Sequence, residues 1–185
     1  MDISATLLML HKPKGYVVTL SDELSRKTVY ELLPDWARRD GWVPAGRLDL
    51  DSKGLLLFSK GGGDVDALTR PGRLAKTYEV WVRGKVTAEH IAQALAGVET
   101  PEGLCRAKSV ELLGGAGPKT RLKVVLEEGK NRHIRRLFGA LKDPKFGTPL
   151  KVLGLKRTAV GDLVLDVPSG EWRFLTAKEA SRLLG

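Results

Sequence analysis

Asp49 is the carboxylate of this chain whose setting best suits chemistry. It lies in the segment GRLDLDSKGLLLFSKGG (Gly46–Gly62), two residues after Arg47 and shortly before an apolar run at 55–58. The apolar run predicts a buried strand, and a loop carboxylate anchored on a rigid strand is well placed for catalysis. Aspartates also form ordinary tight turns, so Asp49 taken alone is as consistent with a turn as with a catalytic role.

The same loop matches a calcium site poorly. Asp49, Asp51 and Gly54 occupy the first, third and sixth positions of an EF-hand loop. Lys53 and Lys60 then stand at the fifth and twelfth positions, where oxygen ligands are required. The one cysteine and three scattered histidines fit neither a disulfide nor a zinc site. With no phosphate-binding or dinucleotide-binding glycine motif, we expect no metal and no cofactor.

Composition bounds the class of protein. A chain of 185 residues with 42% hydrophobic content predicts one domain or two closely packed lobes. The formal charge of +9 favours a polyanionic partner, with nucleic acid first and an anionic membrane surface second. No apolar run approaches the ~20 residues that span a bilayer, and residues 1–14 do not resemble a signal peptide, so we expect a cytoplasmic protein. Single Asn and Gln residues suggest a thermophilic source.

Periodicity predicts intermixed strands and helices. We expect strands at residues 7–11, 55–58, 76–83, 105–113, 120–126, 151–157 and 163–167. We expect helices at 29–33, 64–69, 87–96 and 131–141, and a last helix from Thr176 with a capping box to Glu179. Several strands are joined by short turns, among them Gly114–Pro118. The pattern predicts an α+β fold with a mixed, largely antiparallel sheet and flanking helices.

The predicted helix at 131–141 has one apolar and one basic face. Ile134, Leu137, Phe138 and Leu141 recur at helical spacing, opposite a row of arginines. Lys130 lies just before its start, where backbone amides and cations would suit a phosphate or carboxylate. The alternative without a function is a solvent-exposed basic face, which is the better explanation of any single basic cluster.

Four segments in order resemble one known family. They are HKPKGYV (11–17), GRLDLDSKGLLL (46–57), KTYEVWV (76–82) and EGKNRHIRRLF (128–138). Together they resemble the RsuA/RluB/RluE/RluF branch of bacterial pseudouridine synthases, which isomerise specific uridines in ribosomal RNA. The resemblance covers nearly the whole chain and implies the pseudouridine synthase catalytic fold.

The resemblance also implies roles for particular residues. Asp49 would be the essential catalytic aspartate, Tyr78 would pack on the uracil ring, and Arg135 would be the basic partner that keeps the aspartate ionised. Arg47 would help to hold the target nucleotide out of its helix. The remaining candidates for RNA contact are Lys12, Lys14, Lys76, Lys130, Arg132 and Arg136. For Lys12 and Lys14 structural support is an equal alternative, and Tyr78 and Arg135 could instead be a core tyrosine and a phosphate contact.

The chain departs from the family pattern in three places. Members of this branch commonly carry an N-terminal S4 RNA-binding domain, whereas these catalytic segments begin at once. We therefore expect residues 1–185 to be a single catalytic domain without an S4 domain, as in the RluE-like subgroup that modifies large-subunit RNA. Ser59–Gly63 replaces a TNDG-like sequence, which affects the local loop. Asp143–Thr148 replaces a more compact connection after the basic helix.

The expected function is therefore cofactor-free isomerisation of a uridine in ribosomal RNA, with large-subunit RNA favoured, on a base flipped out of its stack. Asp49 could add to carbon 6 of the base, attack the sugar carbon or remove a ribose proton, and the sequence does not choose among these routes. The alternatives are a non-catalytic ribosomal RNA-binding or assembly protein and a metal-dependent nuclease using Asp49 and Asp51. We expect a monomer that acts on free RNA or on assembly intermediates.

Overall fold

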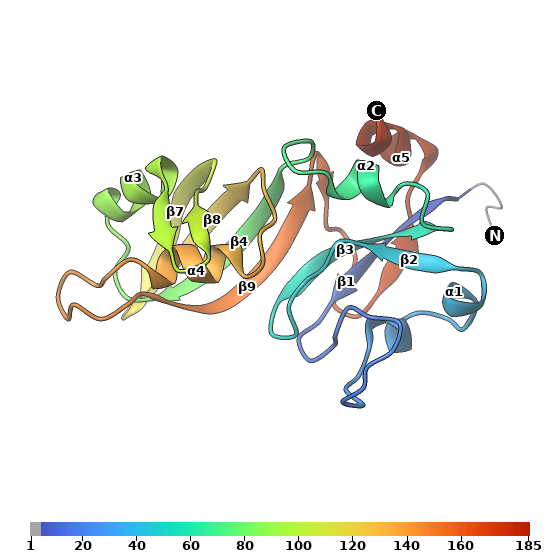
Figure 1. Ribbon diagram of the computed structural model, residues 1–185, viewed down its shortest axis with the longest axis horizontal. Helices are drawn as coiled ribbons and strands as arrows, with labels where there is room; N and C mark the ends of the chain where they lie inside the picture. Colours follow the sequence, from blue (N-terminus) through green and yellow to red (C-terminus); the bar gives the residue numbers. More distant parts are fainter. Residues whose placement is uncertain (1–4) are drawn as a thin grey trace. The chain divides into compact units, whose positions relative to one another are not determined.

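The computed structural model describes residues 5–185, which form two compact units (Figure 1). Unit 1 combines the chain up to Leu74 with Arg157–Gly185, and unit 2 is the continuous segment Ala75–Lys156. The strand β9 (Lys151–Val160) contributes its first six residues to unit 2 and its last four to unit 1. Unit 1 is therefore assembled from two stretches of chain that are far apart in sequence.

Unit 1 is built on a sheet with the strand order β11-β1-β3-β9, in which β2 also pairs with β3 and β10 with β9. The pairs β1–β3, β1–β11, β2–β3 and β9–β10 are antiparallel. The elements besides β9 are β1 (Leu7–Lys12), the 3-10 helix η1 (Val29–Leu32), α1 (Trp36–Arg39), β2 (Trp42–Ala45), β3 (Lys53–Lys60), α2 (Val65–Thr69), β10 (Leu163–Val164), β11 (Trp172–Phe174) and α5 (Ala177–Leu184).

Both faces of the β1–β3 pair are covered. On one face Met9 and Leu57, which lie opposite each other, pack in a cluster with Leu68 of α2 and Leu183 of α5. On the other face Phe58 meets Tyr30 of η1 edge to face, at 5.7 Å between ring centroids. A further cluster of rings on that side consists of the buried Trp42 and the half-buried Trp36, Trp172 and Phe174. Strand β3 is consequently buried almost throughout, as its continuous apolar sequence predicts.

Unit 2 is built on the strand order β9-β4-β8-β7, with a separate two-stranded ribbon of β5 and β6. Its elements besides β9 are β4 (Lys76–Arg83), α3 (Ala88–Ala96), β5 (Val98–Thr100), β6 (Gly103–Cys105), β7 (Ser109–Ala116), β8 (Lys119–Leu126) and α4 (His133–Gly139). In β4 the side chains of Tyr78, Val80 and Val82 are buried, and those between them are half-buried or exposed. The alternation shows that this sheet has one covered face, on which Figure 1 places α3 and α4.

The expected α+β fold with a largely antiparallel sheet is confirmed. The capping box from Thr176 to Glu179 is present at the start of α5. Short elements were missed, namely α1, β2, β5 and β11. Within residues 5–185 no helix is both long and apolar enough to cross a bilayer.

Several predicted elements are wrong in extent, among them the strand expected at 163–167, which covers only Leu163–Val164. The single strand expected at 105–113 is two strands, because Cys105 pairs with Val98 of β5 whereas Ser109 pairs with Val125 of β8. Between them the amide of Ala107 donates to the carbonyl of Ala94 in α3. The chain therefore passes from the β5–β6 ribbon to the main sheet of the unit at this point. The turn that follows is only Gly117–Pro118, since β7 continues to Ala116.

The helix expected at 131–141 is limited to His133–Gly139. Arg132 adopts a left-handed conformation (φ 48°), which prevents the helix from starting earlier. The apolar face is as predicted, because Ile134, Leu137 and Phe138 are buried. A helix of seven residues ending at Gly139 leaves Leu141 in the following turn.

Candidate active-site loop and basic helix

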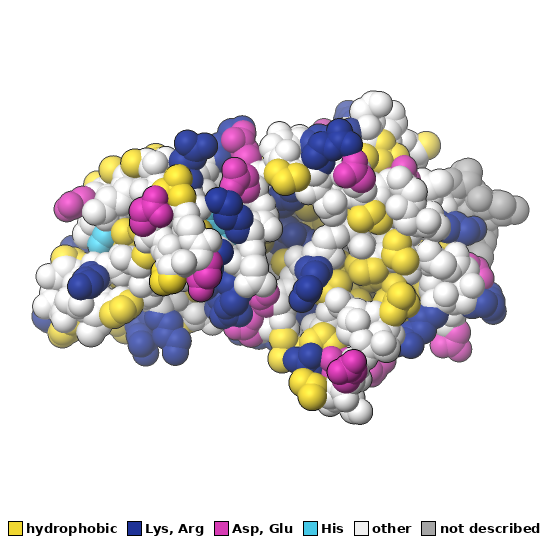
Figure 2. All heavy atoms as spheres, in the orientation of Figure 1, with side chains coloured by type: hydrophobic (Ala, Val, Ile, Leu, Met, Phe, Trp, Pro, Cys, Tyr) yellow, Lys and Arg dark blue, Asp and Glu magenta, His cyan; other side chains and the backbone are white. Residues whose placement is uncertain are grey.

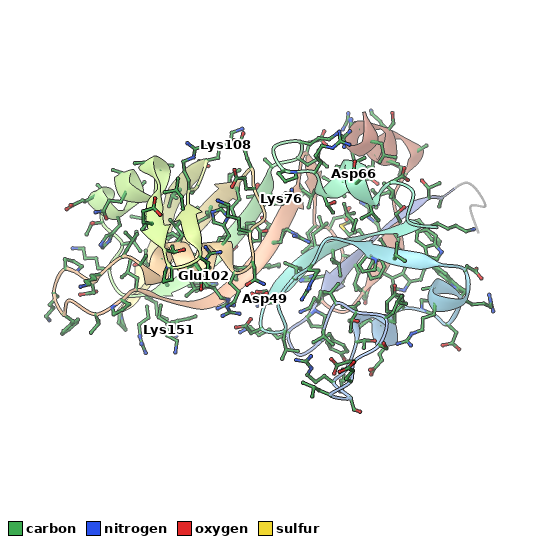
Figure 3. The ribbon with its side chains drawn as sticks, in the orientation of Figure 1. Asp49, Asp66, Lys76, Glu102, Lys108 and Lys151 are labelled. Carbon is green, nitrogen blue, oxygen red and sulfur yellow. The ribbon has the colours of Figure 1, made fainter. Side chains whose placement is uncertain are left out.

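The loop of Asp49 connects β2 to β3 in unit 1 (Figure 3). The amide of Ser52 donates to the carbonyl of Asp49 at 3.0 Å, and the amide of Gly15 donates to the carbonyl of Leu50 at 2.9 Å. Leu48 is buried, whereas Asp49 is half-buried and Arg47 is exposed. The loop is thus a tight turn that also presents a partly accessible carboxylate, so the turn interpretation and the catalytic interpretation are compatible.

Lys12 supports this loop through hydrogen bonds to its backbone. Its side chain is fully buried (0% exposed), and its ammonium group donates to the carbonyls of Ser52 at 2.7 Å, Asp49 at 3.0 Å and Pro13 at 3.1 Å. The carbonyl of Leu50 lies 3.5 Å from the same nitrogen. Three residues of the turn, Asp49, Leu50 and Ser52, therefore share one cation. Of the two roles that the sequence left open for Lys12, the structure favours support of the loop over contact with RNA.

The environment of Lys12 also changes its proton affinity. Burial lowers the pKa of Lys12 from 10.5 to about 8, against the opposing effect of the negative charges on Asp49 and Asp51. A buried ammonium is costly unless polar groups surround it. The carbonyl oxygens of the turn supply that surrounding, so the cation and the loop conformation stabilise each other.

Gly54 fixes the other end of the loop. It pairs with Lys12 in the β1–β3 register and has φ +118°, a region that favours glycine. A Cβ atom at this position would lie 2.2 Å from the carbonyl oxygen of Arg157 on β9. Arg157 is itself buried, and its Nε donates to the carbonyl of Leu55 at 2.8 Å. The close approach of β3 and β9 thus requires glycine where the loop enters the strand.

Unit 2 contains Tyr78, the predicted stacking ring, and Arg135, the predicted basic partner of Asp49. Tyr78 lies on the covered face of β4, opposite Val124 of β8, and is 8% exposed. Arg135 is half-buried on α4, and its Nη1 donates to the carbonyl of Val152 on β9 at 3.2 Å. The sheet and the helix therefore fix both side chains within this unit.

A protein-family model described as RNA pseudouridylate synthase matches residues 6–140, well over half of the chain. The chain belongs to this family. The match begins in β1 and extends through α4, so it includes Lys12, the Asp49 loop, Tyr78 and Arg135.

Named relatives of this family support the assignment. The chain is 36% identical to the ribosomal large subunit pseudouridine synthase B of Vibrio cholerae and 35% identical to that of Vibrio vulnificus. Both alignments cover 98% of this chain and 55% of the relative. The chain thus spans little more than half the length of these curated relatives.

Solved structures agree on the fold. The crystal structure of a pseudouridylate synthase superposes with a TM-score of 0.83 at 29% identity, covering 97% of this chain and 74% of that one. An H/ACA ribonucleoprotein bound to a substrate RNA matches with a TM-score of 0.63 at 20% identity, which shows a shared fold alone.

The lysines predicted to contact RNA differ in their exposure and in their partners. Lys14 is exposed, as an RNA contact requires, but Lys76 is 8% exposed. Lys130 donates to the carbonyl of Leu104 at 2.7 Å and pairs with Glu128 at 3.2 Å. These contacts engage the ammonium group of Lys130 at the start of α4, where the sequence predicts that it binds an anion.

Arg136 has a structural setting too. Its Nη2 donates to the hydroxyl of Thr100 at 2.8 Å, and its Nε lies 2.8 Å from a carboxylate oxygen of Glu102, which Figure 3 labels at the β5–β6 turn. The arginine ties α4 to that ribbon, so the structure favours a role in packing. Arg132, by contrast, is exposed.

The predicted residues are divided between the units. Unit 1 holds Asp49, Arg47, Lys12 and Lys14, and brings Lys12 into contact with the Asp49 turn. Unit 2 holds Tyr78, Arg135, Lys76, Lys130, Arg132 and Arg136. Across the described residues 5–185 no group of three or more His, Cys, Asp or Glu side chains could hold a metal ion. Figure 2 shows the Lys and Arg side chains of the visible face interspersed with Asp and Glu.

Sequence reasoning missed one supporting residue and left the role of another open. Gly54 was noted only as a position in a calcium pattern, and the clamp made by Lys12 was one of two options. A signal for the clamp exists, because Lys12 directly follows five apolar or aromatic residues of a buried strand and precedes Pro13. A lysine at the end of a strand that is buried on both faces must find acceptors nearby.

Proposed function

We propose that this chain is an RNA pseudouridine synthase that converts a uridine of ribosomal RNA, in the large subunit, into pseudouridine. The observation that carries the proposal is the Asp49 turn, a carboxylate loop clamped by Lys12 and Gly54 within the segment that matches the family. The activity named for the relatives supplies the substrate class.

The reaction breaks the bond between the ribose and nitrogen 1 of uracil, turns the detached base and joins the ribose to carbon 5. Carbon 5 then loses its proton and nitrogen 1 gains one, so the product is an isomer of the substrate. It needs no external electron, group donor or energy source. An ionised Asp49 can serve as nucleophile toward carbon 6 or the sugar carbon, or as base toward a ribose proton. The clamp limits the freedom of the loop, and such preorganisation can contribute several kcal/mol to a rate.

The other family residues take the roles that the resemblance implies. Arg47, exposed on the turn, occupies the space that the target base leaves when it flips out of its helix. Tyr78 stacks on the uracil. The Arg135 guanidinium stays charged at physiological pH and favours the ionised carboxylate of Asp49. We assign both units to a single catalytic domain on this basis.

The deciding experiment is incubation of the purified protein with unmodified ribosomal RNA, without metal or nucleotide, followed by carbodiimide-stop mapping. We expect one new stop in large-subunit RNA that disappears in Asp49→Ala. Asp51→Ala is the matched control, because it removes an exposed carboxylate from the same turn, and it should retain the stop. If the wild type binds RNA tightly but produces no stop on free RNA or assembly intermediates, a non-catalytic ribosomal RNA-binding protein becomes the better assignment.

Arg135→Ala tests the proposed partner. We expect turnover to fall by at least about a hundredfold, on the scale of losing one preorganised charge, while RNA affinity changes little. Single-turnover rates and filter binding separate the two quantities. Near-normal turnover in Arg135→Ala would refute the assignment and leave Arg135 as a phosphate contact.

We further propose that the protein acts as a monomer in the cytoplasm, where ribosomal RNA is made in bacteria such as those of its relatives. The scarcity of Asn and Gln supports a thermophilic source.

A further inference from the structure

The outward face of the unit 2 sheet carries an exposed tryptophan among cations. On β4 and β8 the side chains on this face are Thr77, Glu79, Trp81, Arg83, Lys119, Arg121, Lys123 and Val125. Trp81 is 37% exposed, and Arg83 and Lys119 are exposed. Helices α3 and α4 lie on the other face of the sheet (Figure 1), so this one is open within the unit.

The strand register places like charges side by side. Arg83 lies directly opposite Lys119, and Trp81 lies directly opposite Arg121. Like charges at opposed positions of an antiparallel pair destabilise a sheet. Arg121 is neutralised by Glu79 at 3.0 Å, but within unit 2 neither Arg83 nor Lys119 has a carboxylate within 4 Å among the described ion pairs. An anion bound between the two cations would relieve their repulsion.

The indole of Trp81 is accessible beside these cations. The Arg121 guanidinium lies over its ring at 5.4 Å from the centroid. On the neighbouring strand β9 the residue next to the ring is Gly154, where a Cβ atom would lie 3.5 Å from Cδ1 of Trp81. The edge of the indole therefore lies against Gly154, and Trp81 as a whole remains 37% exposed.

We propose that this face binds a single-stranded segment of RNA, with a base stacked on Trp81 and a phosphate held between Arg83 and Lys119. A planar ring beside paired cations is the arrangement that single-stranded nucleic acids use, because stacking and phosphate contact act together. An acidic peptide would satisfy the cations but would offer no base to the indole. Taking the polyanion to be RNA rests on the proposed function.

The site differs from the one assigned to the target uridine. Tyr78 and Trp81 are three residues apart on β4, so their side chains lie on opposite faces of the sheet. A nucleotide on Trp81 would therefore belong to another part of the RNA than the isomerised one. The face would then raise affinity for the substrate without taking part in the chemistry.

The test measures binding of a fluorescein-labelled, unstructured ten-nucleotide RNA by polarisation, with tryptophan fluorescence recorded in parallel. Trp81→Ala should weaken binding about tenfold, within the range measured for base stacking on aromatic side chains. The double variant Arg83→Ser with Lys119→Ser should reduce the slope of log K against log salt by about 0.7, since both cations contact one phosphate and each neutralised single-strand phosphate contributes about 0.7. The matched control, Lys178→Ser with Arg182→Ser on α5, removes the same charge from unit 1 and should leave the slope unchanged.

Turnover is measured separately on ribosomal RNA, where Trp81→Ala should raise KM and leave kcat unchanged. If no pseudouridine forms even in the wild type, the proposed function fails while the binding assay still decides this site.

Wild-type affinity in both the Trp81 variant and the double variant would overturn the RNA site. Equal quenching by poly-glutamate would overturn it as well, in favour of a general anion or protein surface. Because the double variant changes only exposed side chains, it keeps the test valid should Trp81→Ala fold poorly.

Discussion

Strands β3 and β4 are both eight residues long, but they differ in how much of their side-chain surface is exposed to solvent. Strand β3 of unit 1 is buried from Gly54 to Ser59, whereas β4 of unit 2 alternates between buried and accessible side chains. A strand buried on both faces cannot shift without breaking its packing. Unit 1 is accordingly suited to fix the Asp49 turn, and unit 2 retains an open face that can contact a large polar partner.

The largest expected effect distinguishes Gly54 of β3 from Gly154 of β9. Gly54→Ala should destabilise the protein by on the order of 3 kcal/mol, because the new Cβ would overlap the backbone of Arg157 and the residue has φ +118°. Gly154→Ala, in unit 2, brings its Cβ only into ordinary contact with Trp81 and should change stability by less than about 1 kcal/mol. Urea unfolding of the two variants measures both values. Equal stabilities would contradict the rigid attachment of the Asp49 turn.

Lys12→Met tests the clamp next. The methionine keeps the apolar length but removes the donor from three carbonyls, so we expect a loss of about 2–3 kcal/mol of stability, as for buried groups left unpaired. Single-turnover pseudouridine formation should also slow by about a hundredfold, because the Asp49 turn loses its fixed geometry. Lys14→Met, two residues along and exposed, is the control and should leave the unfolding midpoint unchanged.

The pH dependence of stability provides a sharper test of the same lysine. Its pKa is about 8 in the folded protein and near 10.5 when unfolded, so the unfolded chain binds more protons between these values. The free energy of unfolding contributed by Lys12 should therefore rise as pH increases from 8 to 10.5. Subtracting the profile of Lys12→Met isolates this contribution. A flat difference across that interval would show that the ammonium is not held as described.

The smallest effect concerns the end of unit 1. Arg173 donates to Glu179 at 2.8 and 2.9 Å and to Asp166 at 2.8 Å, and the hydrogen bonds from Arg173 lower the pKa of Glu179 to about 2. Glu179→Gln should cost about 1 kcal/mol, because the amide keeps the acceptor of the capping box but loses the charge pair with Arg173. The wild type should lose this contribution as pH falls from about 4.5 toward 2, and the variant should not. Acid titration followed by circular dichroism compares them.

The parts of the fold that sequence could predict are those with local causes. The alternation of β4, the apolar face of α4 and the cap of α5 follow from residue spacing and were predicted correctly. The break after Cys105 was not, because it depends on hydrogen bonds of residues 106–108 to His133, Ala94 and Val125. Short elements such as β11 exist only because β1 pairs with them.

In the candidate site, too, local features could be predicted from the sequence and long-range contacts could not. The position of Asp49 in a turn before a buried strand could be predicted from local sequence. The clamp could not be chosen over RNA contact, since Lys12 and Ser52 are 40 residues apart and meet only in the folded sheet. The family resemblance supplied roles for Tyr78 and Arg135 that no spacing would have indicated.

The discontinuous make-up of unit 1 bears on the order of events during synthesis. Strand β1 pairs with β11, whose residues Trp172–Phe174 leave the ribosome more than a hundred residues later. Unit 2 is a continuous segment and can fold once Lys156 has emerged, whereas the contacts that complete unit 1 are non-local and slow to form. We therefore expect the nascent chain to carry a folded unit 2 while the first strand still awaits its last neighbour.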